Sequence, residues 1–381
     1  MEQLYKERHM NKNLPWLQVA RGIAALIVVC HHLTAAEHFY FSVNIFSGLF
    51  TPGWNAVDFF FVLSGFIIYY IHARDLGHRE RWKRYITKRL VRIYPIYWVV
   101  AFLFLALVVA GNSNGQVSRS EVSDVFHQPA YLLKCLLLIP QTATPFCYVS
   151  WSLCFEVFFY LVFGLGILIG KRALWILPIL FFGLNIAQLL SPAIFNGNYW
   201  AGFLSANYHL EFLLGMLVAW CHRMIPEAHA ARWGVRWLWF PGLLLFALTW
   251  QGSLVNETVF GKYSVYSRLG YGSGAALIIL AIARMEEIRS NGFNRFLLLL
   301  GDASYSLYLI HTLLLAVLFK LFIRLGIHGQ SAWVCVLLFV LSGFLCVLTG
   351  IAMHLKIEKP LLSVLNKNAP AKLAGKTPVK A

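Results

Sequence analysis

Long runs of apolar residues recur along the chain and predict membrane spans. A spanning helix needs about 17–25 predominantly apolar residues. We find ten such stretches, at residues 15–37, 54–73, 92–110, 150–169, 173–190, 203–221, 236–250, 267–284, 302–323 and 332–354. A further apolar stretch, at 130–140, is short, and we expect it to lie at the membrane interface or to re-enter the membrane.

The basic residues between these stretches are distributed unevenly and predict the orientation. Of the 32 Lys and Arg residues, 25 fall on one side of the predicted membrane and six on the other, while Arg21 lies inside a span. Because cytoplasmic loops carry the excess of Lys and Arg, we expect both termini and the loop at 74–91 to be cytoplasmic. The sequence therefore predicts an all-α integral membrane protein with about ten transmembrane helices.

This pattern also sets the expected domain limits. Residues 1–14 form a cytoplasmic tail, residues 15–361 form one transmembrane domain, and residues 362–381 form a Lys-rich cytoplasmic tail that we expect to be disordered.

Composition agrees with a membrane protein and excludes other classes. Hydrophobic residues make up 59% of the chain and charged residues 13%, against about 25% charged in soluble domains. This excludes an ordinary soluble enzyme, a disordered protein and a nucleic-acid binder, and the positive-inside rule accounts for the net charge of +16. The seven cysteines form no CxxC pair, so we predict no metal site. Cys135 and Cys147 are the two cysteines on the outer side and could form a disulfide.

The first predicted helix carries Arg21, His31 and His32. At 100° per residue, Arg21 and His32 lie within about 20° of one face and about 16 Å apart along the axis, whereas His31 is rotated by about 80°. Ionisable residues inside a span are costly, so by default they indicate function. The alternative is an arginine that snorkels to the interface and a packed histidine.

Two acidic residues enter other predicted spans. Asp58 opens the second span, where it either pairs with a His or Arg or caps the start of the helix. Glu156 lies about two turns into the fourth span, on the face of Ser152. A buried carboxyl needs a partner or a proton, so structural pairing and catalysis both stay open for Glu156.

Two further pairs have the spacing of one helix face. Arg89 and Arg92, at the end of the basic loop, suit a phosphorylated cytosolic ligand, although positive-inside charge alone explains them on spacing. Tyr308 and His311 share a stripe with Ser304 in the ninth span. His311 is either a second functional histidine or a hydrogen-bonded packing residue.

In order along the chain, these residues resemble the acyltransferase-3 family of membrane O-acyltransferases, and within it bacterial exopolysaccharide and O-antigen O-acetyltransferases. The resemblance covers about residues 14–361. It rests on five motifs: Arg21 followed after ten residues by His32, Asp58-Phe-Phe-Phe-Val-Leu-Ser-Gly, Arg89-x-x-Arg92-Ile-Tyr-Pro, Trp151-Ser152-x-x-x-Glu156, and Ser304-Tyr-Ser-Leu-Tyr308-Leu-Ile-His311. Ile357-Glu-Lys-Pro360 also fits, whereas Phe155 stands where the family more often has a second Glu.

The resemblance implies transfer of an acetyl group from cytosolic acetyl-CoA to a sugar hydroxyl of a polysaccharide or lipid-linked oligosaccharide. It implies a multi-pass protein of the bacterial inner membrane, with no metal and no nucleic acid among its partners. His32 and Arg21 would be the central catalytic pair, with Glu156 and Asp58 as further candidates. Arg89 and Arg92, together with Tyr308 and His311, would contact the donor.

Chemistry agrees with this implication and leaves two routes open. A thioester is already activated, and a positioned His base contributes typically 10²–10⁴-fold, while Arg21 or Tyr308 could stabilise the developing oxyanion. His32 either deprotonates the acceptor or accepts the acyl group transiently. The alternatives are a proton-coupled transporter of a small solute, for which we see no inverted repeat, or a glycan-assembly scaffold, which would not need the Arg21–His32 stripe.

Overall fold

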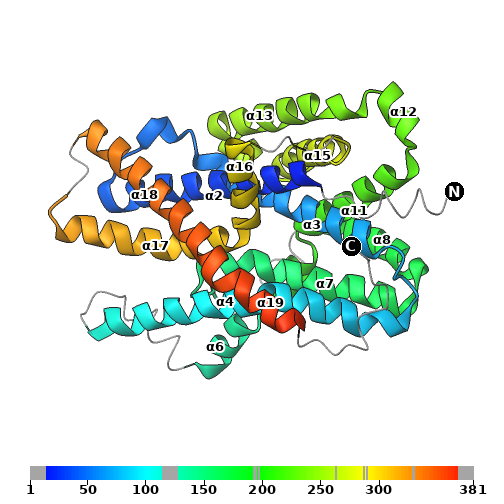
Figure 1. Cartoon of the computed structure of the whole chain (residues 1–381), viewed down its shortest axis with the longest axis horizontal. Coiled ribbons are helices and arrows are strands. Elements are labelled where there is room, and N and C mark those ends of the chain that lie inside the picture. Colours follow the sequence, from blue (N-terminus) through cyan, green and yellow to red (C-terminus); the bar gives the residue numbers. More distant parts are fainter. Residues whose placement is uncertain are drawn as a thin grey trace.

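The computed structural model describes residues 14–113, 128–191, 195, 198–261, 264–285, 288, 291–327 and 331–367. In these ranges every regular element is helical, which confirms the predicted all-α class (Figure 1). Eight helices of this part are long and apolar enough to cross a membrane. The multi-pass architecture is therefore shown, while the count of ten spans and the orientation stay predictions.

The eight candidate spans correspond to eight of the ten predicted stretches. They are α2 (Pro15–Phe41), α3 (Ala56–His72), α4 (Trp82–Ser113), α7 (Trp151–Ile169), α13 (Trp239–Val255), α15 (Val265–Ile282), α17 (Ser304–Arg324) and α18 (Ala332–Met353). The other two stretches are also helical, as α8 (Lys171–Leu190) and α11 (Tyr208–Met224), but their apolar parts are shorter.

Shorter helices connect these spans. They are η1 (Ile45–Gly48), η2 (Thr51–Asn55), η3 (Arg79–Arg81), α6 (Pro129–Leu136), η4 (Tyr148–Ser150), α10 (Tyr199–Leu204), α12 (Glu227–Arg232), η5 (Val235–Leu238), α14 (Glu257–Phe260), α16 (Gly292–Asp302), the π-helical turn η6 (His354–Glu358) and α19 (Lys359–Lys367).

Some predicted boundaries differ from the structure. The stretch 203–221 is divided between α10 and α11, and α4 begins inside the predicted basic loop, at Trp82. The predicted disorder of 362–381 is wrong for residues 362–367, because α18 continues through η6 into α19. The amphipathic sequence Pro360-Leu-Leu-Ser-Val-Leu gives this segment an apolar face. Residues 1–13 and 368–381 lie outside the described residues.

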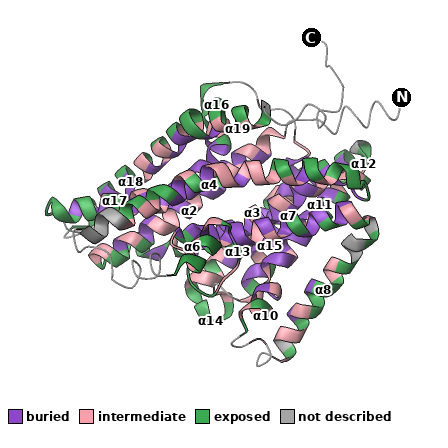
Figure 2. Ribbon diagram, turned by 90° about the horizontal axis from the view of Figure 1, so that it is seen from below, coloured by how far each residue is buried: buried purple, intermediate pink, exposed green. Residues whose placement is uncertain are grey.

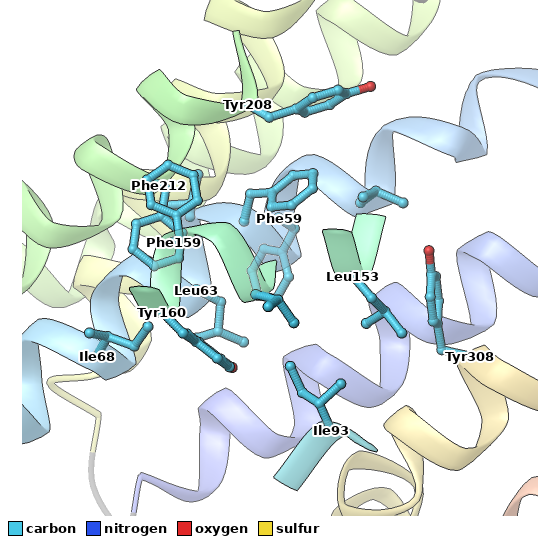
Figure 3. Close-up of a cluster of buried hydrophobic side chains, with 14 of the residues drawn as sticks. Phe59, Leu63, Ile68, Ile93, Leu153, Phe159, Tyr160, Tyr208, Phe212 and Tyr308 are labelled. Carbon is cyan, nitrogen blue, oxygen red and sulfur yellow. The ribbon is translucent and has the colours of Figure 1, made fainter. Parts of the chain in front are cut away.

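The core lies on the helices at the centre of the bundle. Buried residues gather on α3, α7 and α11, whereas α8 carries mostly exposed and intermediate positions (Figure 2). A large buried cluster joins α3, α4, α7, α11, α15 and α17, and a smaller one joins α2, α17 and α18. Within the large cluster, Phe159 of α7 stacks on Phe212 of α11 with ring centroids 3.8 Å apart (Figure 3).

Helices α3 and α11 cross at two glycines. A Cβ atom at Gly65 would collide with the carbonyl oxygen of Phe212, and one at Gly215 would collide with the carbonyl oxygen of Val62. Small residues at such a crossing let two backbones approach closely, which is a common way to pack helices in membranes. The crossing fixes α3, which carries polar residues at both of its ends.

The short apolar stretch 130–140 forms α6 and is attached to α4. Three side chains of α4 donate hydrogen bonds to its last carbonyls: Tyr94 to Leu137 (2.7 Å), Tyr97 to Cys135 (2.6 Å) and Trp98 to Leu136 (2.9 Å). The predicted disulfide is wrong, because Cys135 and Cys147 are both free thiols.

Candidate functional site

A cavity of about 1020 Å³ opens between α2, α3, α4, α7, α17 and α19. Its volume is at the upper end of the range of about 300–1,000 Å³ typical of small-molecule sites. The starts of α2, α4 and α17 line it, together with η6 and α19, which follow α18, and with residues along α3 and α7. The sequence pattern predicts that the starts of α2, α4 and α17 and the end of α18 lie on the same side of the membrane.

One part of the cavity wall is strongly basic. Four of its cations come from the first three turns of α4 and one from α19: Arg84, Lys88, Arg89, Arg92 and Lys359. Because α4 starts at Trp82, the basic loop of the sequence is largely a helix whose one face lines the cavity. The wall therefore offers a concentrated positive charge to an anionic ligand.

The two predicted arginines differ in their partners. Arg89 donates from Nη2 to Nε2 of His72 (2.8 Å), and its guanidinium lies over the ring of Tyr160 (5.6 Å to the centroid). Arg92 instead forms an ion pair between its Nη1 and Oε1 of Glu358 (3.2 Å), a carboxylate whose side chain is only 1% exposed. Arg92 is therefore compensated by a negative charge, whereas Arg89 bonds to an imidazole.

Arg21, Glu156 and Tyr308 also line the cavity, and we call this part of its lining the inner end. Arg21 donates from Nη1 to Oε1 of Gln18 (2.9 Å), one turn earlier on α2, and both side chains line the cavity. Glu156 accepts hydrogen bonds on Oε1 from Ser64 (3.1 Å) and from the hydroxyl of Tyr160 (2.5 Å). Both donors therefore converge on one oxygen of this carboxyl group.

Tyr308 of α17 is hydrogen-bonded to Ser152 at the start of α7. Its hydroxyl lies 2.7 Å from Oγ of Ser152 and 3.1 Å from the carbonyl oxygen of Val149. Tyr308 and Ser152 both line the cavity, and the ring of Tyr308 lies 6.0 Å from that of His311. Tyr308 thus lines the cavity and also lies near His311; Figure 3 shows its ring beside Leu153 of α7.

His32 and His311 are in direct contact. Nε2 of His311 lies 3.2 Å from Nδ1 of His32, although the residues are 279 positions apart in the sequence. Nδ1 of His311 lies 3.1 Å from the carbonyl oxygen of Leu307 and Nδ1 of His32 lies 3.0 Å from that of Val28. The Cβ of His31 packs against Gly53, and its ring lies edge-on to that of His32 with centroids 4.9 Å apart.

These contacts fix the tautomers of the pair when both rings are neutral. A carbonyl oxygen only accepts, so Nδ1 of His311 carries its proton and its Nε2 is an acceptor. Nδ1 of His32 is then the donor to His311, and the lone pair of His32 is on Nε2. His311 therefore orients the ring of His32 and supports any positive charge that forms there.

Asp58 lies in a different cluster from the cavity residues. It forms a buried ion pair with Arg268 of α15, which also donates to the hydroxyl of Tyr208 (2.9 Å) and lies over the rings of Trp54 and Tyr208 (5.0 and 4.4 Å). Glu211 is 3.9 Å from the same guanidinium. Of the two interpretations of Asp58, the pairing with an arginine is the one that the structure shows.

Among the described residues, no group of three or more His, Cys, Asp or Glu side chains could hold a metal ion.

Comparison with known proteins decides what kind of site this is. The sequence profile described as an acyltransferase domain matches residues 14–353. The chain belongs to the acyltransferase-3 family. This confirms the family that the motifs resemble, and it makes the chain a membrane-bound O-acyltransferase.

Relatives in several bacteria agree with this family. The chain is 29% identical to the exopolysaccharide production protein ExoZ of Rhizobium meliloti over 82% of this chain and 90% of the relative. It is 25% identical to the acyltransferase MdmB of Streptomyces mycarofaciens over 95% of both chains. It is 28% identical to the O-acetyltransferase OatA of Staphylococcus aureus over 44% of this chain and 26% of the relative. No solved structure matches the chain.

In this acyltransferase, seven of the eight predicted site residues come together in two adjoining groups. Arg21, Arg89, Arg92, Glu156 and Tyr308 line the cavity, and His32 and His311 touch beyond Tyr308. Asp58 is the exception. His72, Ser64 and Tyr160 were not among the predicted site residues, although each is hydrogen-bonded to Arg89 or Glu156. The one feature that could have indicated them is a polar side chain in an apolar helix.

Proposed function

We propose that this acyltransferase transfers an acetyl group from cytosolic acetyl-CoA to a hydroxyl of a cell-surface glycan or its lipid-linked precursor, in the bacterial inner membrane. The observation that carries the proposal is the cavity. It joins a basic wall to polar residues beside the His32–His311 pair. The names of the relatives ExoZ and OatA support a glycan acceptor and an acetyl group.

The basic wall suits the donor. CoA carries a nucleotide with several phosphate charges, and the basic wall presents five cationic side chains of which Glu358 compensates one. Arginine recognises phosphate through parallel hydrogen bonds. We assign the phosphates to Arg84, Lys88 and Arg89, which leaves the pantetheine arm to extend toward Tyr308.

The His32–His311 pair suits proton transfer. Nε2 of His32 takes the proton of the acceptor hydroxyl as its oxygen attacks the thioester carbonyl carbon. The C–S bond then breaks, and the proton passes from His32 to the thiolate of CoA. Donation from Nδ1 of His32 to His311 keeps the lone pair on Nε2 and holds the ring in place.

Two cavity residues suit the charge that develops on the carbonyl oxygen. Arg21 is a permanent cation at the inner end of the cavity, and Tyr308 has a hydroxyl there. A preorganised donor of this kind typically contributes about 10²–10³ in kcat. Glu156 lies near these groups, and we assign to it the orientation of the inner end through Ser64 and Tyr160.

If His32 instead accepts the acetyl group, the same nitrogen forms the bond. An acyl-enzyme would then form without acceptor, and rapid acid quenching followed by intact mass measurement would detect an added acetyl group. We favour the direct route because the contact with His311 supplies what a general base needs. An acetylated protein whose label maps to His32 and is lost on adding acceptor would establish the other route.

The test of the proposed function uses the purified full chain and acetyl-CoA. We expect slow release of CoA with water as the acceptor, and loss of O-acetyl groups from surface glycan in cells that lack the protein. Protein that binds no acetyl-CoA and releases no CoA, from cells with unchanged glycan acetylation, would contradict the proposal.

A further inference from the structure

Arg89 is the end of a chain of hydrogen bonds that starts outside the cavity. Nη1 of Arg81 donates to Oδ1 of Asp75 (2.7 Å). Nδ1 of His72 lies 2.7 Å from Oδ2 of Asp75, and Nε2 of His72 lies 2.8 Å from Nη2 of Arg89. Four side chains from the end of α3, the following turn and the start of α4 are therefore connected in series.

The chemistry of the two ends determines where the protons lie. A guanidinium only donates, so Nε2 of His72 must accept from Arg89 and carry the lone pair. The proton of the ring is then on Nδ1, which donates to Asp75. In a doubly protonated His72, Nε2 would carry a proton and could not accept from Nη2 of Arg89. This arrangement therefore requires a neutral imidazole.

The surroundings hold the ring of His72 in this orientation. Its side chain is 9% exposed, and the ring packs edge-on against Tyr85 with centroids 4.9 Å apart. Asp75 stays ionised: burial raises the pKa of its carboxyl, but hydrogen bonds from His72 and Arg81 outweigh burial and bring the pKa below its usual value. Lys88, on the neighbouring turn of α4, adds a further positive charge nearby.

The contrast with Arg92 indicates what the chain is for. Arg92 is paired with the carboxylate of Glu358, so a phosphate would compete with a negative charge already in place. A neutral imidazole fixes the position of Arg89 without compensating its charge. The carboxylate in this chain of hydrogen bonds, Asp75, contacts Arg89 only through His72, and it also forms an ion pair with Arg81.

We propose that His72, oriented by Asp75, is a positioning residue that holds the guanidinium of Arg89 in the cavity to bind a phosphate of the acyl donor. This inference rests on the proposed function, since it assumes a phosphorylated donor in the cavity. His72 does not contact the reacting atoms. It sets the affinity for the donor by reducing the number of orientations that Arg89 can adopt.

The test measures binding of CoA itself to the purified full chain by titration calorimetry, so that no acceptor is needed. The variants are H72F, which keeps the ring shape without nitrogens, and H72Q, which keeps an acceptor for Arg89. R89A and the H72F/R89A double variant complete a cycle. H78F is the matched control, because His78 is an exposed histidine of the same loop that bonds to Glu80.

We expect H72F to weaken CoA binding about tenfold, as loss of a hydrogen bond to a charged group implies, and to reduce its salt dependence. H72Q should recover most of the affinity, and H78F should equal the wild type. In the R89A background, H72F should have no further effect, because a positioning role vanishes with the residue it positions.

The outcomes separate this inference from the function on which it rests. If R89A leaves CoA affinity unchanged, the donor site itself is wrong. If R89A weakens binding but H72F does not, or if the two effects simply add, His72 does not position Arg89. A loss in H72F that H72Q fails to recover would assign His72 to packing against Tyr85.

Discussion

The two ends of α3 carry charges in two different states. At its start, Asp58 is paired with Arg268 in a cluster that Tyr208 and Trp54 enclose, with both charged side chains at most 5% exposed. At its middle and its end, Ser64 and His72 contact Glu156 and Arg89, whose side chains line a large cavity. Ionisable residues in a span indicate function by default, yet only the second group faces a space that a substrate can enter.

The difference teaches how to separate structural from functional charge in a membrane domain. An ion pair whose partners are all within the protein contributes to the packing of helices, here α3, α11 and α15. When an arginine beside a cavity is hydrogen-bonded to a neutral partner, that partner does not compensate its positive charge, and the arginine can pair with an anionic ligand. We therefore infer that Asp58 acts through folding, whereas Arg21, Arg89 and Glu156 act on the substrate.

The largest effect should come from removing Arg268 from the buried cluster that it forms with Asp58 and Glu211. R268A leaves Asp58 and Glu211 buried without their cation, and removal of one partner of a buried pair costs about 3–5 kcal/mol. We expect most of the protein to be lost from the membrane, as measured by the folded fraction in size-exclusion chromatography. The double variant D58L/R268L removes both charges and should recover folded protein and part of the activity. Folded R268A that has lost only activity would make this cluster part of the site.

A smaller effect should separate the two arginines of the basic wall. R89A should weaken CoA binding about tenfold or more, because a charge-assisted hydrogen bond is lost, while the fold remains. R92A should weaken it by about twofold, since Glu358 already compensates Arg92. Titration at low and high salt measures both, and the effect of R89A should shrink at high salt. Equal losses in the two variants would contradict the distinction.

The smallest effect concerns the inner end of the cavity. Y160F removes one of the two hydrogen bonds to Glu156 and leaves that from Ser64. We expect kcat to fall by about two- to tenfold with CoA affinity unchanged, because a single hydrogen bond typically contributes about 0.5–1.5 kcal/mol. Steady-state kinetics of CoA release measure it, with Y94F as the control, since Tyr94 bonds to the carbonyl of Leu137 in α6. A change in CoA affinity instead of kcat would move Glu156 to donor binding.

The sequence predicts the relative positions of site residues that lie on the same helix. Helical periodicity places His32 and His31 at different angles around one helix, and it groups Ser304, Tyr308 and His311 on one stripe. These relations follow from 100° per residue within one helix. The ordered motifs also predict which helices contribute to the cavity.

Contacts between side chains of different helices could not be predicted from the sequence. Arg268 is 210 positions from Asp58, and nothing in either span indicates which charge meets which. His72 lies beside a basic loop, where a histidine looks like one more polar residue, and only the fold brings it against Arg89. The continuation of α18 into α19 was missed because a lysine-rich end resembles a solvated tail.

The central claim is that His32, oriented by His311, carries the transfer. The most direct measurement is acetyl transfer per unit of folded protein for H32A, with H31A as the matched control on the neighbouring position. We predict that H32A abolishes transfer while its CoA affinity stays near that of the wild type, because His32 lies beyond the donor cavity. H31A should keep most of the activity. An active H32A, or an inactive but folded H31A, would contradict this account.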